Sequence, residues 1–115
     1  AAAHAVNDGF AQEPQAHGMY HGEKVAFGTL VQLVLEKAPQ EELEQVLAFL
    51  RDTGLPLTLA QLGVKEIVPE TLKKVAEAAV VPTQSTKNLR ADITAQEVYD
   101  AILEADRIGR DYLAR

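Results

Sequence analysis

Apolar residues recur along this chain at spacings typical of α-helices, and glycine or proline separates the apolar stretches. Over residues 22–37, apolar residues cover most of the helical circumference, which predicts a helix buried on several sides. These residues are Val25, Phe27, Leu30, Val31, Leu33, Val34 and Leu35. Pro39 is predicted to end this helix and to start the next, which has a single apolar face and stops at Gly54.

The sequence pattern in the second half of the chain predicts three more helices. Thr58 is predicted to cap a brief helix over 59–62, and Pro69 to begin one that runs to about Val80. A polar run with Pro82 predicts a loop over 81–93. Thr94 and Glu97 have the spacing of a capping box, which predicts a last helix over 95–113.

The first twenty residues predict a short helix over 1–8, closed by Gly9 in a left-handed conformation, and then a loop over 10–20. The chain starts at Ala1 inside that helix, without a capping residue, so we interpret it as the tail of a longer protein. No stretch alternates as a strand does. The predicted fold is an all-α helical bundle, one domain over 1–115.

Composition narrows the functions that this chain can have. Among 115 residues, 11 are basic and 17 acidic, a net charge of −6, which argues against binding to nucleic acid or to anionic membranes. Hydrophobic residues make up 47 %, enough for a core, yet no stretch is long enough to span a membrane. There is no cysteine and no signal-peptide pattern at the start, so we expect a cytoplasmic protein.

The candidate chemistry rests on His4 and His21, which lie near the ends of two neighbouring predicted helices. Neutral imidazoles are common metal ligands, and two such histidines can converge on one ion. A catalytic metal usually takes three protein ligands, so a third donor is needed. The alternatives are a packed or solvent-facing His4 and a His21 that only begins a helix.

Other polar residues are weaker candidates. His17 is expected in a loop, near the metal ligands at most. Glu23 could orient a ligand histidine, but an acidic residue in a first helical turn needs no function. Asp8 could supply the missing carboxylate. No glycine-rich phosphate loop is present, and Ser85 has no histidine nearby in the sequence.

Four segments carry a resemblance to a known family: Ala2-Ala3-His4-Ala5-Val6, His21-Gly22-Glu23-Lys24-Val25-Ala26-Phe27-Gly28, Gly54-Leu55-Pro56-Leu57-Thr58-Leu59 and Val98-Tyr99-Asp100-Ala101-Ile102. Together they resemble the iron- or zinc-dependent polyol dehydrogenases, and among these the NAD-dependent glycerol dehydrogenases. The resemblance implies the C-terminal metal-binding domain of a dehydroquinate synthase-like, iron-containing alcohol dehydrogenase fold.

The resemblance also implies a site and a reaction. Family members bind Zn²⁺ (or Fe²⁺) through one aspartate and two histidines, and His4 and His21 match the histidines. The aspartate and the NAD-binding residues would belong to an N-terminal part of the enzyme outside this chain. The implied reaction oxidises glycerol to dihydroxyacetone with NAD, in a homo-oligomer. We expect this chain alone to be inactive.

Two departures from the family pattern leave alternatives open. Asn7 stands where these enzymes commonly have another histidine, and residues 81–88 differ from the usual acidic loop. One alternative is a related metal-dependent alcohol or glycerol-phosphate dehydrogenase. The other is a non-catalytic helical interaction module.

Overall fold

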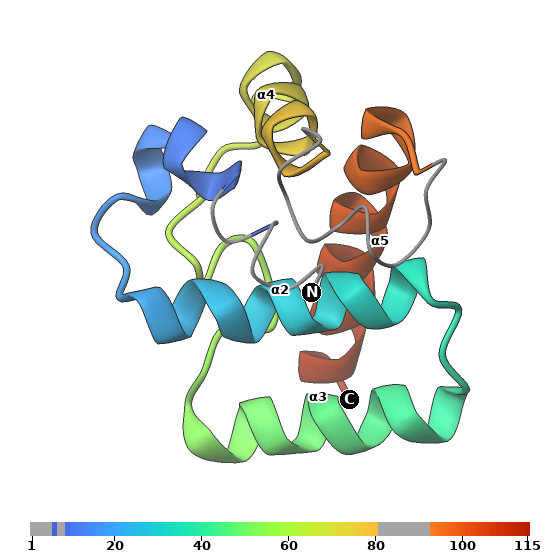
Figure 1. The fold of residues 1–115 in the computed structure, drawn as a ribbon. Helices are drawn as coiled ribbons and strands as arrows, with labels where there is room; N and C mark the ends of the chain where they lie inside the picture. The colour runs from blue at the N-terminus through green and yellow to red at the C-terminus, as the bar shows by residue number, and fades with distance from the viewer. Residues whose placement is uncertain (1–5, 7–8, 81–92) are drawn as a thin grey trace.

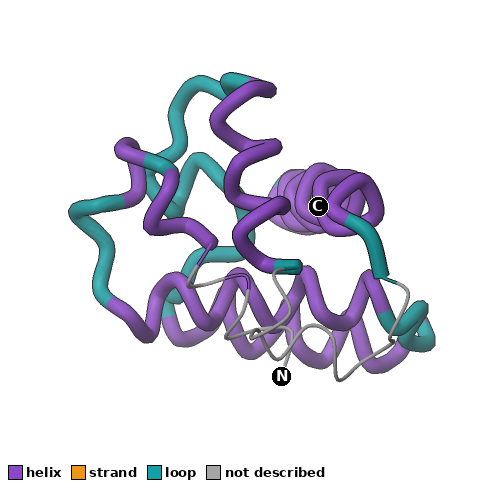
Figure 2. The backbone as a smooth tube through the Cα atoms, turned by 45° about the horizontal axis from the view of Figure 1, so that its top comes forward, coloured by secondary structure: helices purple, strands orange, loops and turns teal. Residues whose placement is uncertain are grey.

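A computed structural model describes Val6, residues 9–80 and residues 93–115 of the chain. Every regular element in this part of the chain is helical, and Figure 2 shows no strand in it. The four α-helices are α2 (His21–Leu35), α3 (Gln40–Thr53), α4 (Pro69–Ala79) and α5 (Ala95–Leu113). Their bounds confirm the predicted all-α fold.

Helix α5 lies at the centre of the arrangement. It packs against α2, α3 and α4, while α2 and α3 run antiparallel to one another in Figure 1. In Figure 2, α5 is seen nearly end-on while α2 runs across the view below it, so the two helices lie at a steep angle to each other. One core joins the helices through Phe27, Leu47, Leu72 and Ile102, all at most 1 % exposed.

Local signals fix several helix ends as the sequence predicts. Thr94 and Glu97 form the capping box of α5: the Glu97 backbone N–H donates to Thr94 Oγ1 at 3.2 Å, and the Thr94 N–H donates to Glu97 Oε1 at 3.2 Å. Gly54 ends α3 with φ of +76°, a left-handed conformation that glycine adopts without steric cost.

Three predictions need correction. Gly9 has φ of −61°, so it is no left-handed cap. A glycine stands there because a Cβ would come within 2.5 Å of the Val75 carbonyl oxygen of α4. The predicted loop over 10–20 contains two 3₁₀ turns, η1 (Phe10–Gln12) and η2 (Pro14–Ala16).

The brief helix expected at 59–62 is a hydrogen-bonded turn. Thr58 does cap it, since its Oγ1 accepts from the Gln61 N–H at 3.0 Å. The turn closes at Gly63, which has φ of +102°. That left-handed residue stops the turn from extending into a helix.

Candidate metal site

His21 is the first residue of α2, directly after the N-cap residue Tyr20. The Tyr20 backbone N–H donates to Glu23 Oε1 at 3.1 Å, and the Glu23 N–H donates to the Tyr20 carbonyl at 3.1 Å. Glu23 therefore fixes the start of the helix, which is the non-functional explanation of its position. The side chain of His21 lies outside what the structure describes, as do His4, Asn7 and Asp8.

The residues that flank both histidines are anchored in one core. Val6, two residues after His4, is fully buried, and so are Phe10 and Phe27. The rings of Phe10 and Phe27 meet edge to face with centroids 6.2 Å apart, which ties the segment after His4 to the second turn of α2. Close packing thus holds Val6, Phe10 and the second turn of α2 in one core, and the structure does not test whether the two imidazoles converge.

A buried carboxylate that the sequence did not indicate lies between the two histidines in the chain. Glu13 is 1 % exposed, and its Oε1 accepts from the Gln15 N–H at 3.0 Å. Gln15 in turn donates from Nε2 to the Glu66 carbonyl at 2.7 Å and accepts from the Lys65 N–H at 3.1 Å. Glu13 and Gln15 therefore fasten the η1–η2 segment to residues 65–66.

His17 is exposed, and its Nε2 lies 3.0 Å from the Ala11 carbonyl oxygen. This contact joins two residues of the same segment, so it does not connect His17 to another part of the fold.

In the described part of the chain, no group of three or more histidine, cysteine, aspartate or glutamate side chains could hold a metal ion. The same residues contain no helix long and apolar enough to cross a membrane.

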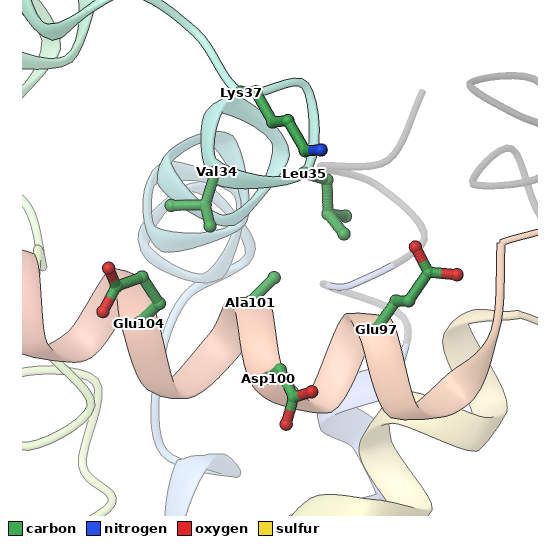
Figure 3. A pocket seen from close by; sticks show the side chains of 7 residues that line it. All are labelled: Val34, Leu35, Lys37, Glu97, Asp100, Ala101 and Glu104. Carbon is green, nitrogen blue, oxygen red and sulfur yellow. The ribbon is translucent and has the colours of Figure 1, made fainter.

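A pocket lies at the C-terminal end of α2, where this helix meets α5. This pocket, shown in Figure 3, has a volume of about 260 Å³ and is lined in part by Lys37, Glu97, Asp100 and Glu104. Each carboxylate already has a local partner: Glu97 accepts from Thr94, Asp100 from Gln96, and Glu104 from Arg107. The hydrogen bond from Arg107 lowers the pKa of Glu104 below its ordinary value. We interpret these carboxylates as a solvated helix face.

The chain is a homologue of the glycerol dehydrogenases. It is 53 % identical over 98 % of its length to a glycerol dehydrogenase of Escherichia coli, covering 31 % of that protein. With a Citrobacter freundii glycerol dehydrogenase it shares 46 % identity over its whole length, covering 32 % of that protein.

A solved structure gives the same result for the fold. The crystal structure of a glycerol dehydrogenase from Schizosaccharomyces pombe matches 97 % of this chain with a TM-score of 0.92 and 36 % identity, covering 29 % of that chain. No protein-family model matches the chain. The chain spans about a third of the length of the relatives it matches.

Proposed function

We propose that this chain is the C-terminal helical part of an enzyme that oxidises glycerol to dihydroxyacetone with NAD. The observation that carries the proposal is the 53 % identity to a glycerol dehydrogenase across 98 % of the chain. The rest of the enzyme would supply the NAD-binding domain. Because the chain covers only 31 % of that relative, the reaction is proposed for the whole enzyme and not for this chain alone.

We further propose that His4 and His21 bind a Zn²⁺ or Fe²⁺ ion together with an aspartate from elsewhere in the enzyme. Two imidazoles and one carboxylate form a donor set that suits either metal and leaves a position open for substrate. The bound metal would act as a Lewis acid that lowers the pKa of a substrate hydroxyl, and NAD would accept the hydride.

The contribution of this chain is to hold the two ligands in place. The Tyr20–Glu23 contact fixes the first turn of α2. The packing of Phe10 on Phe27, and the burial of Val6, restrain the segment that follows His4. A ligand at a helix start that is fixed in this way, as proposed for His21, loses little freedom when the metal binds, which favours a defined coordination geometry.

The test uses the full-length enzyme and its three histidines in this region. We expect His4→Ala and His21→Ala each to remove stoichiometric metal and to lower NADH formation from glycerol by at least about 100-fold, because each removes a direct ligand. His17→Ala is the matched control, since His17 is exposed and its ring Nε2 lies within hydrogen-bond distance of the Ala11 carbonyl of its own segment. It should retain metal and activity.

Other outcomes would contradict parts of the proposal. Full metal content in both His4→Ala and His21→Ala would show that these two histidines do not bind the metal. Activity of the unmodified enzyme with another alcohol or with glycerol phosphate, and not with glycerol, would identify a related dehydrogenase. An enzyme with neither metal nor dehydrogenase activity would support the helical interaction module.

A further inference from the structure

An open apolar groove runs between α2 and α3, on the side of α2 away from α5. Its volume is about 340 Å³. The lining includes Val25, Ala26 and Thr29 of α2 and Val46, Phe49 and Leu50 of α3. No charged side chain lines it, although the chain as a whole carries a net charge of −6.

The groove explains why α2 is apolar around most of its circumference. One side of the helix faces the core through Phe27, Leu30 and Val31, which are fully buried. The other side, with Val25 and Thr29, is only half-buried and faces the groove. Across it, the Phe49 side chain is 60 % exposed. Exposed apolar surface gathered in one depression is typical of a surface that contacts another protein element or a ligand.

The position of the groove indicates which part of the enzyme covers it. The lining includes Gly22, the residue directly after His21, so the groove reaches the end of α2 that carries the predicted metal ligand. In the proposed function, the third metal ligand approaches this same end from the part of the enzyme that this chain does not span. The relatives are about three times as long as the chain, which leaves ample length for such an element.

We propose that an apolar helix from the rest of the same polypeptide packs into the α2–α3 groove. Two antiparallel helices present side-chain ridges between which a third helix can pack, with apolar residues every three or four positions. Phe49 would then be a buried contact and not a solvated side chain. This inference rests on the proposed function, because it takes the chain to be one part of a longer dehydrogenase.

Photo-cross-linking in the full-length enzyme tests the inference. We would place benzoylphenylalanine at position 49 and, as the control, at position 113, since Leu113 is an exposed apolar residue at the far end of α5. At position 49 we expect a product of monomer mass in which the cross-linked peptide comes from outside residues 1–115. The control should not yield that peptide.

A dimer-mass product at position 49 would show that a second copy covers the groove, and the proposal would be wrong. Cross-links confined to residues 1–115 would also overturn it. Should the bulky residue impair folding, Phe49→Cys provides a second measurement: we expect it to react with a maleimide at least about tenfold more slowly than Leu113→Cys in the native enzyme. Equal rates would contradict the inference.

These readouts do not depend on metal or substrate. An intramolecular cross-link in an enzyme that does not oxidise glycerol would overturn the proposed function alone. An active glycerol dehydrogenase whose groove is open, or is covered by a second copy, would overturn this inference alone.

Discussion

At the scale of single residues, a glycine of α5 leaves no room for a side chain where the 55–58 link passes over the helix. Gly109 is buried there, and a Cβ on it would lie 1.7 Å from the Leu57 carbonyl oxygen. We therefore expect Gly109→Ala to lower the free energy of unfolding by about 3 kcal/mol, because the link or the helix must shift. Denaturant unfolding measures this. Gly18→Ala is the control, since nothing beyond its own chain neighbours lies within 4 Å of its Cβ position, and equal effects would contradict the explanation.

Asp106 holds the same link from one helical turn away. Its side chain is 5 % exposed; Oδ1 accepts from the Leu59 N–H at 2.8 Å and Oδ2 from Arg110 Nε at 3.0 Å. Asp106→Ala leaves a buried N–H without a partner, so we expect a loss of about 2–4 kcal/mol in unfolding free energy. Asp100→Ala, at an exposed position of the same helix, should change it by less than about 0.5 kcal/mol. A similar loss in both variants would show that the Leu59 contact is not the cause.

At the scale of elements, the turn that follows α2 contains a residue in an unfavourable conformation. Lys37 has φ of +55°, and the Ala38 N–H donates back to the Leu33 carbonyl at 3.0 Å. This pattern normally has glycine at the left-handed position. We expect Lys37→Gly to raise the free energy of unfolding by about 1 kcal/mol, since the left-handed conformation costs other residues about that much. Thermal unfolding of Lys37→Gly is compared with that of Glu36→Gly, the control for a general effect of glycine. Glu36 has φ of −80°, a conformation that does not favour glycine, so Glu36→Gly should lower the stability.

Helix α5 carries an ion-pair cluster on its exposed side. Arg107 Nε donates to Glu104 Oε1 at 2.6 Å, and Nη1 donates to Asp111 Oδ2 at 2.8 Å. The hydrogen bond from Arg107 lowers the pKa of Glu104 in the folded state. The pair therefore stabilises the fold above the unfolded pKa of this carboxyl, and the contribution is lost as the pH falls through the lowered, folded pKa. In Arg107→Gln we expect an NMR titration to show the Glu104 pKa raised toward its ordinary value; an unchanged pKa would exclude Arg107 as the cause.

The sequence predicts those helix ends that are set by neighbouring residues in the chain. The Thr94–Glu97 box and Gly54 act within one turn, and both are where the pattern places them. Gly9 and Gly109 are glycines because of contacts with distant segments, which no local pattern contains. Asp106 could have been recognised, because it lies four residues after Ile102 on the apolar face of α5.

The candidate site was predictable only in part, for the same reason. His21 stands out as a candidate because it begins an apolar helix, and with His4 it resembles a family pattern. A metal site joins residues from separate parts of a fold, so the third ligand of the proposed site cannot be found by the spacing of residues within this chain. Glu13 was not predicted either, since its burial depends on the folding of η1 and η2 as compact turns.

At the scale of the whole molecule, the proposed activity divides between this chain and the rest of the enzyme. Two imidazoles alone hold a divalent metal poorly, because catalytic sites usually draw three ligands from the protein. We therefore expect purified residues 1–115 to form no NADH from glycerol, even with added metal and NAD. Circular dichroism must show helix in the same sample, so that inactivity is not a result of unfolding. The full-length enzyme under identical conditions is the positive control, and NADH formation by residues 1–115 would mean that this chain holds a complete site.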